Sequence, residues 1–272
     1  MPQQPPDRCS QHLLDSTALR ALARRSDLRG AVQCAAHAAC LSATGLLVWL
    51  AEPLWYFLIP AMALQGVAIV TLFAPMHECV HRTAFASRAA NDTFGWIAGV
   101  LGFYNSTYYR YFHAWHHRYT QDPARDPELL YPKARNRIDY FKEITGFMFW
   151  FRRAVDYPAL ALGGTRRLPF VPDSARRQVA FSVSVQLLIY LAGAVSIALG
   201  FRGVLYFWFL PALLAQPLLR ALLIVEHTGC NASFSGPHVA VGNLRISQTE
   251  CTQRCAVRRE RRRSPDRGSA RR

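Results

Sequence analysis

The sequence predicts an all-α integral membrane protein, with four transmembrane helices in two hairpins and a cytoplasmic helical cap. Three observations lead to this prediction. First, 51% of the 272 residues are hydrophobic and yet the formal net charge is +15, so apolar and basic residues must be segregated along the chain. Second, four apolar runs each have the roughly 20 residues needed to cross a hydrocarbon core. Third, nearly all Lys and Arg lie outside the two short turns that join these runs in pairs, as is typical of basic cytoplasmic loops.

The first predicted hairpin consists of residues 31–51 and 53–75, which turn at Glu52. Aromatic side chains favour membrane interfaces, and three of them flank this turn: Trp49, Trp55 and Tyr56. Residues 1–30 precede the hairpin. They are polar and contain several arginines, so we expect a cytoplasmic N-terminal segment without a cleavable signal peptide.

A strongly basic loop of residues 76–178 separates the two hairpins. Within it, residues 94–104 are apolar but too few to span a membrane, which predicts a re-entrant or interfacial segment. Residues 141–151 are aromatic and flanked by charges. This pattern indicates a helix that lies in the interface.

The second predicted hairpin consists of residues 179–199 and 203–225. Arg220 lies inside its second run, and a charge within a membrane is a candidate functional residue. Arg220 is also close to the predicted helix end, so the alternative is that its side chain extends to the membrane surface. Both interpretations remain open at this point.

Four spans place both termini and the central loop on one side of the membrane. The positive-inside rule assigns that side to the cytoplasm. Because the arginines are interleaved with apolar runs, the net charge indicates basic loops, and we expect no nucleic-acid partner. Seven cysteines at scattered positions do not predict a disulfide framework.

The histidines indicate a metal site. Five of the nine lie in two short clusters, His77-Glu78-Cys79-Val80-His81 and His113-Ala114-Trp115-His116-His117. Residues three or four apart share a face of a helix, so the imidazoles of each cluster would project together. Neutral imidazole is the commonest metal ligand. His227 follows the fourth run, so the topology brings six histidines to the cytoplasmic face.

Two metal sites are compatible with these residues. The first cluster fits the HExxH pattern of zinc proteases, in which Glu78 would be the general base, so an intramembrane zinc metalloprotease is the alternative. A catalytic zinc uses three protein ligands, and six candidates are too many for one ion. Two metal ions in a shared histidine cage fit the number better.

The sequences HECVH, HAWHH and EHTGC (residues 226–230), together with the four spans, resemble the membrane fatty acid desaturase and hydroxylase superfamily. The resemblance covers residues 30–230 and implies a di-iron enzyme whose histidine boxes lie on the cytoplasmic face. It implies metal ligands at six positions: His77, His81, His113, His116, His117 and His227. Glu78 and Asp122 are candidate partners that orient these imidazoles, as carboxylates do at metal sites.

The same resemblance implies the chemistry. Two iron ions would use dioxygen to desaturate or hydroxylate a fatty acyl chain of a lipid, with residues 94–104 as a candidate wall of the acyl channel. Electrons would come from a separate donor, a ferredoxin or a b-type cytochrome, which a basic surface suits. The location would be the bacterial inner membrane or the endoplasmic reticulum, with the site and both termini cytoplasmic.

One feature of the superfamily does not occur in these residues. A third box, HxxHH or QxxHH, is expected some tens of residues after His227, and the only later histidine is His238. Residues 231–272 instead form a basic stretch without a hydrophobic period, which predicts a disordered tail. Our hypothesis is that the sequence is truncated or frame-shifted near Cys230, which would leave the di-iron site incomplete and its activity uncertain.

Overall fold

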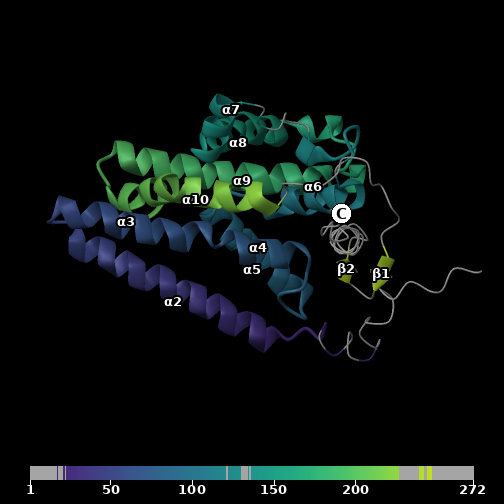
Figure 1. Ribbon diagram of the computed structural model, residues 1–272, viewed down its shortest axis with the longest axis horizontal. Coiled ribbons are helices and arrows are strands. Elements are labelled where there is room, and N and C mark those ends of the chain that lie inside the picture. Colours follow the sequence, from purple (N-terminus) through teal and green to yellow (C-terminus); the bar gives the residue numbers. More distant parts are fainter. Residues whose placement is uncertain are drawn as a thin grey trace, which may run out of the picture.

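The computed structural model describes residues 23–120, 122–129, 136–226, 239–241 and 244–246, together with the single residues 17, 21 and 134. Helices dominate this part of the chain (Figure 1). In chain order they are α2 (Asp27–Ala51), α3 (Trp55–Val70), α4 (Phe73–Val80), α5 (Arg88–Leu101), α6 (Ser106–Tyr119), α7 (Arg137–Ile144), α8 (Phe147–Ala161), α9 (Asp173–Ala198) and α10 (Leu210–Glu226). The expected all-α class is confirmed.

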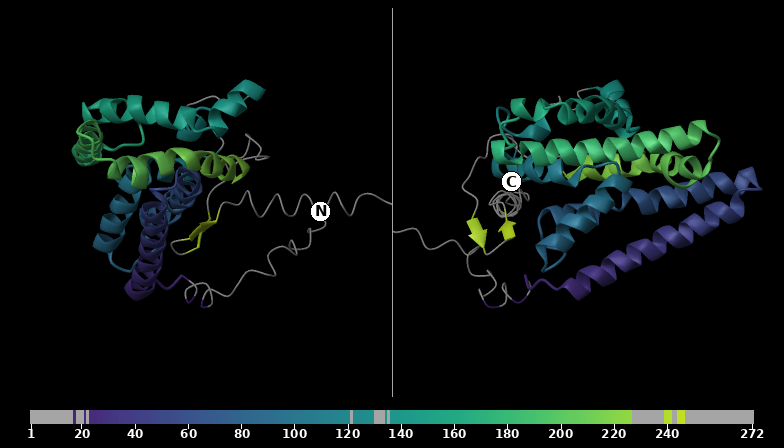
Figure 2. Two further views of the ribbon diagram at one scale, coloured as in Figure 1. Left: turned by 90° about the vertical axis from the view of Figure 1, so that its left-hand side faces the viewer. Right: turned by 180° about the vertical axis from the view of Figure 1, so that it is seen from behind.

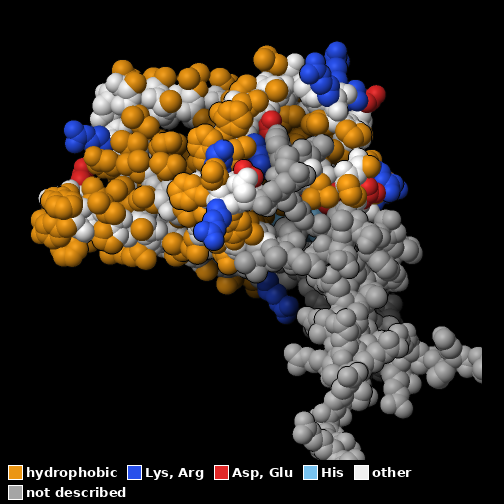
Figure 3. Space-filling model, turned by 45° about the horizontal axis from the view of Figure 1, so that its top comes forward, with side chains coloured by type: hydrophobic (Ala, Val, Ile, Leu, Met, Phe, Trp, Pro, Cys, Tyr) orange, Lys and Arg blue, Asp and Glu red, His pale blue; other side chains and the backbone are white. Residues whose placement is uncertain are grey.

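The described residues include four helical segments that are long and apolar enough to cross a membrane: Asp27–Ala51, Trp55–Val80, Asp173–Ala198 and Leu205–Ile224. They coincide with the four predicted apolar runs. The second segment consists of α3 and α4 with a turn between them, and the fourth begins with a π-helical turn, Leu205–Phe209, before α10. Many large hydrophobic side chains on these segments are exposed, and hydrophobic groups cover much of the surface in Figure 3.

Helix α3 lies between α2 and α10 and packs against both. A glycine allows the close approach to α10, because a Cβ at Gly66 would lie 2.1 Å from the carbonyl oxygen of Pro211. Pro211 has no N–H, so it cannot bond the carbonyl one turn before it, at Phe207. The side-chain amide of Gln65 donates to that carbonyl instead, at 3.1 Å. A polar side chain of α3 thereby satisfies a backbone group that proline leaves unpaired.

The connection between α5 and α6, residues 102–105, is buried inside the bundle and not at its surface. Phe103, Tyr104 and Asn105 are each no more than 8% exposed, and Phe103 has a positive φ of 63°. Helix α5 begins at the N-cap Ser87, whose side chain accepts from the backbone of Ala90. The predicted re-entrant segment is therefore the end of a helix followed by a tight, enclosed turn.

Side chains from three other segments bond carbonyl groups at the C-terminal end of α5 and in this buried turn, where the hydrogen bonds of the helix end. Tyr190 Oη donates to the carbonyl of Val100 at 3.0 Å, and Trp208 Nε1 donates to that of Leu101 at 2.8 Å. Arg153 Nε donates to Phe103 at 3.0 Å, and Gln186 Nε2 donates to Tyr104 at 3.1 Å. Donors from α8, α9 and the π-helical turn thus fix the position of the α5–α6 pair.

The described part of the tail consists of two short strands, β1 (Val239–Val241) and β2 (Leu244–Ile246), which pair antiparallel with Val239 opposite Ile246. The prediction that residues 231–272 form a disordered tail stays a prediction. Figure 2 shows both strands beside the end of the bundle at which α2 begins. The remaining residues of the tail lie outside the described part.

We predict that Tyr157→Phe lowers the stability of the fold. The Tyr157 hydroxyl accepts from the backbone N–H of Asn105 at 2.9 Å and donates to the carbonyl of Phe103 at 3.3 Å. Its removal leaves a buried N–H unpaired, which costs about 1–3 kcal/mol. Thermal unfolding in detergent measures the effect. The matched control is Tyr140→Phe on the exposed surface of α7, and equal melting temperatures for the two variants would contradict the prediction.

Candidate metal centre

Two helices position the histidines. On α4 and its C-cap, His77 and His81 are one turn apart, and their ring centroids are separated by 4.6 Å. On α6, His113 and His117 are likewise one turn apart, with ring centroids 4.3 Å apart. Helix α6 starts at Asn105, whose side chain accepts from the backbone of Tyr108 at 2.9 Å. The buried turn that fixes the start of α6 therefore also sets the positions of its histidines.

An acidic residue on α5 joins the two histidine-bearing helices. Asp92 accepts from Arg110 of α6 at 2.5 Å and from Arg82, directly after the first cluster, at 3.4 Å. Helix α5 also packs closely on α4, because a Cβ at Gly95 would lie 2.8 Å from Cys79 Cβ. These contacts hold α4 and α6 at a fixed separation.

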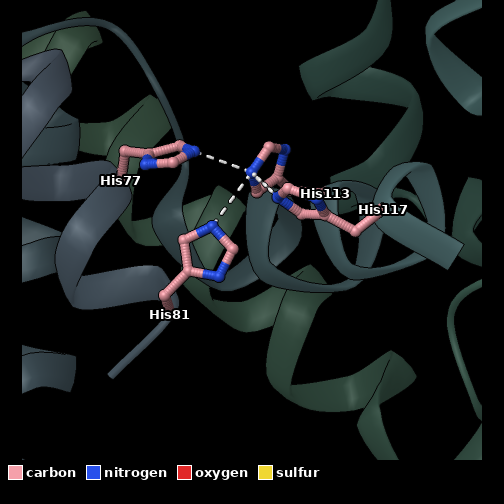
Figure 4. A group of neighbouring side chains, drawn as sticks. All are labelled: His77, His81, His113 and His117. Atoms are coloured by element: carbon pink, nitrogen blue, oxygen red, sulfur yellow. Dashed lines mark hydrogen bonds between the residues drawn. The ribbon is translucent and has the colours of Figure 1, made fainter. Parts of the chain in front are cut away.

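Four of the predicted ligands come together. His77, His81, His113 and His117 each offer a nitrogen, and these atoms all lie within 4.8 Å of one another. Figure 4 shows the rings converging from the two helices, with His113 between the others. The Nε2 atom of His113 is 2.7 Å from that of His77, 3.1 Å from that of His81 and 2.9 Å from that of His117.

This arrangement fits a cation better than it fits hydrogen bonding alone. A neutral imidazole nitrogen carries either one proton or one lone pair, so His113 Nε2 can make only one of its three contacts as an ordinary hydrogen bond. Burial, and then the neighbouring imidazoles, lower the pKa of His113 below its usual range. Burial, followed by His77, also lowers the pKa of His81. Metal ligation needs the neutral imidazole that these shifts favour.

Polar groups lie at the Nδ1 side of the rings, away from the point of convergence. Tyr109 stacks on His113 with an interplanar angle of 12° and has its hydroxyl 3.3 Å from His113 Nδ1. Glu78 Oε1 is 3.8 Å from His77 Nδ1, and its other oxygen accepts from Thr83 at 2.5 Å. Glu78 is therefore on the far side of His77 from the four Nε2 atoms. This position suits a residue that orients the ring, and it gives no support to the zinc-protease alternative, in which Glu78 is the general base.

His116 lies beside this group but is not one of its four members. Its ring centroid is 5.8 Å from that of His113 and 5.7 Å from that of His117. Its Nδ1 atom lies 2.9 Å from a carboxylate oxygen of Asp126, whose side chain is fully buried, and 3.5 Å from one of Glu128. His116 thus has a carboxylate at Nδ1, as metal-ligating histidines commonly do.

Asp126 is the acidic residue that the sequence interpretation missed. The sequence suggested Asp122, which instead pairs with Arg125 at 2.5 Å and accepts from the backbone of Ala124. Both aspartates precede a proline in the same loop, so nothing in the local sequence distinguishes them. Their surroundings distinguish them in space, because the Asp126 side chain is fully buried beside His116, whereas that of Asp122 pairs with Arg125. His227 lies outside the described residues, immediately after α10, so its predicted role as a ligand stays a prediction.

Known proteins resemble the part of the chain that holds these histidines. A family model described as fatty acid desaturase matches residues 47–264. The chain is 27% identical over 193 residues to an sn-1 oleoyl-lipid 12-desaturase of a Picosynechococcus species, covering 66% of this chain and 54% of that protein. It is 27% identical over 211 residues to the enzyme of the same name from Anabaena variabilis, covering 74% and 60%. A Delta(9) fatty acid conjugase-like enzyme of Dimorphotheca sinuata is 26% identical over 207 residues, covering 67% and 52%. The chain therefore spans little more than half the length of these relatives.

We predict that His113→Ala abolishes metal binding at this site. His113 Nε2 is the atom that the other three histidines approach, so its removal leaves them without a common centre. Iron or zinc per purified chain, measured by inductively coupled plasma mass spectrometry, should fall to background. His37→Ala on α2 is the control, and an unchanged metal content in His113→Ala would refute the site.

We predict that Asp126→Asn weakens metal retention and that Asp122→Asn does not. Loss of a carboxylate that orients a ligating histidine lowers metal affinity about 10- to 100-fold, whereas Asp122 contacts Arg125. Competition of the loaded protein against a graded chelator gives the apparent affinity of each variant. Equal retention in the two variants would mean that His116 does not act as a ligand.

Proposed function

Because this chain belongs to the fatty acid desaturase family, we propose that it is the histidine-bearing part of a membrane oxidoreductase that acts on a fatty acyl chain of a lipid. The observation that carries the proposal is the convergence of four Nε2 atoms, contributed by two helices, within 4.8 Å. A set of imidazole donors of this kind suits iron and zinc. The family favours a pair of irons, which would supply the activation of dioxygen needed to attack an unactivated C–H bond.

The residues of the chain have three functions in this proposal. His77, His81, His113 and His117 hold the metal through neutral Nε2 atoms, and His116 and His227 are the further ligands implied by the resemblance. Glu78, Tyr109 and Asp126 hold the rings at Nδ1 and so fix which nitrogen faces inward. The third function is to cover one side of the centre and limit its access to water. The Phe73 ring has its centroid 5.8 Å from that of His77, and the rings of Tyr104 and Tyr109 lie 4.9 and 5.9 Å from Phe73.

The relatives, the basic loop and the apolar helices support the proposed substrate, electron donor and location. The relatives named above are lipid desaturases, which supports a lipid acyl substrate, dioxygen as oxidant and either desaturation or hydroxylation as the outcome. The basic residues of the loop support an acidic electron donor, a ferredoxin or a b-type cytochrome. The four long apolar helices support a multi-pass location in the bacterial inner membrane or endoplasmic reticulum, with the metal centre and both termini in the cytoplasm.

The ligand set remains incomplete in this proposal. Four histidines are in the cluster, and residues 231–272 contain one further histidine, His238, and no third box. We propose that residues 231–272 are a segment distinct from the desaturase-like domain, residues 31–230, although the family match continues to residue 264. The other two reading frames of the DNA beyond codon 230 test this division, because a frame shift predicts an HxxHH-type motif in one of them.

We predict that the purified chain binds iron in preference to zinc, at fewer than two ions per chain. The reason is that residues 231–272 contain no third box, while the four histidines of the cluster are together. Metal analysis gives the ratio, and mass spectrometry of host lipids detects a new double bond or hydroxyl group in the acyl chains. The matched control is His113→Ala, which should yield neither iron nor product. One tightly held zinc per chain would contradict the proposal, and two irons per chain would contradict the predicted stoichiometry.

A further inference from the structure

Three polar side-chain atoms near the start of α8 and the middle of α10 are buried and have no hydrogen-bond partner: Trp150 Nε1, Gln216 Oε1 and Arg220 Nε. We call them the polar cluster. A Cβ placed at Gly146 would lie 2.8 Å from Gln216 Cβ and 3.9 Å from Trp150 Nε1, so both groups lie against the same glycine. Gln216 and Arg220 are one turn apart and share a face of α10. Buried polar groups of native proteins are normally paired, and the polar cluster therefore calls for a partner.

Arg220 does not extend along α10 to the membrane surface. Its NH2 group donates to the hydroxyl of Tyr104, and its guanidinium lies 4.8 Å from the centre of the Phe149 ring. The alternative in which Arg220 is a functional residue, left open by the sequence, is therefore the one that the geometry supports. An arginine within a span that points into the protein is expected to have a specific partner.

Among the residues that the structure describes, no acidic side chain balances the charge on Arg220. A second guanidinium, that of Arg153, lies 4.6 Å from the centre of the same Phe149 ring. The ion pairs of arginines among the described residues involve Arg82, Arg110, Arg125, Arg152 and Arg176, and neither Arg153 nor Arg220. Two cations thus share one aromatic neighbour without a carboxylate. Such a local excess of positive charge in apolar surroundings favours an anion.

We propose that the polar cluster binds the anionic head group of a lipid amphiphile. A carboxylate or phosphate oxygen would accept from Arg220 Nε and Trp150 Nε1, and Gln216 Oε1 would accept from a hydroxyl group or a water molecule bound with it. An amphiphile fits better than a free inorganic anion because the surrounding contacts are apolar and α10 belongs to a segment able to cross a membrane. Arg220 and Trp150 are only partly buried as whole residues, whereas their unpaired nitrogens are buried, so the head group would bind below the surface.

The polar cluster is distinct from the candidate metal centre. Phe73 and Tyr104 lie between them, because Phe73 contacts His77 at 5.8 Å and Tyr104 at 4.9 Å, and Tyr104 bonds Arg220. The inference therefore does not require bound metal or an active enzyme. Its test on the metal-free chain can fail or succeed independently of the proposed function.

The test is a titration of the full chain, metal-free and in a non-ionic detergent, followed by native mass spectrometry. Oleate and lysophosphatidylglycerol are the anionic probes, and oleyl alcohol and monooleoylglycerol are their neutral counterparts. We expect the anionic probes to bind more tightly, and Arg220→Gln to weaken them about tenfold or more, as the loss of a charge-assisted hydrogen bond predicts. Arg177→Gln, which removes an exposed charge of α9, is the matched control and should change binding less than about twofold.

Further variants guard against a folding defect. Arg220→Lys retains the charge and should lose less affinity than Arg220→Gln, and Trp150→Phe retains the ring but removes the N–H donor and should also weaken binding. Circular dichroism melting identifies any variant that fails to fold. The relative affinity for oleate and lysophosphatidylglycerol tells whether the site takes a carboxylate or a phosphate. Equal binding of neutral and anionic probes, no binding of any probe, or an equal loss in Arg177→Gln would overturn the inference.

Discussion

The need to pair backbone carbonyl groups inside an apolar bundle is the constraint on which the rest of this structure depends. The turn from α5 to α6 is enclosed by protein, so water cannot satisfy the carbonyls of Val100, Leu101, Phe103 and Tyr104. Donors from α8, α9 and the π-helical turn do so instead. Each of these donors fixes one segment relative to the start of α6. The position of the histidines on α6 is thereby determined by hydrogen bonds that are remote from the metal centre.

The centre itself combines inward Nε2 atoms with polar groups at Nδ1. Tyr109, Glu78 and Asp126 lie at the Nδ1 atoms of His113, His77 and His116. In these rings Nδ1 contacts a polar side chain, which leaves Nε2 available to a metal ion. The lowered pKa of His113 keeps its ring neutral. The aromatic side chains around the centre separate it from the polar cluster on α10. One bundle therefore holds a neutral donor site for a cation and, apart from it, two arginines that have no acidic partner among the described residues.

Much of the fold could be predicted from the sequence, because transmembrane helices need only length and hydrophobicity, and both are visible in four runs. The pairing of His77 with His81 and of His113 with His117 could be predicted from helical spacing alone. Their convergence across two helices depends on Asp92, Arg82 and Arg110, whose contacts span 10 and 18 residues and leave no periodic signal. For the same reason Asp126 could not be distinguished from Asp122. The inward orientation of Arg220 depends on Tyr104, which is 116 positions away.

The proline at position 211 has a consequence for how this family of sequences can vary. Its missing N–H makes the carbonyl of Phe207 dependent on Gln65, which in turn accepts from Thr44 of α2. Two side-chain hydrogen bonds, from Thr44 to Gln65 and from Gln65 to Phe207, thus connect α2, α3 and the start of the fourth segment. Loss of Gln65 is harmful while residue 211 is proline and becomes tolerable once it is not, which is epistasis. Positions 44, 65 and 211 would then be inherited as a set, although they are far apart in the chain.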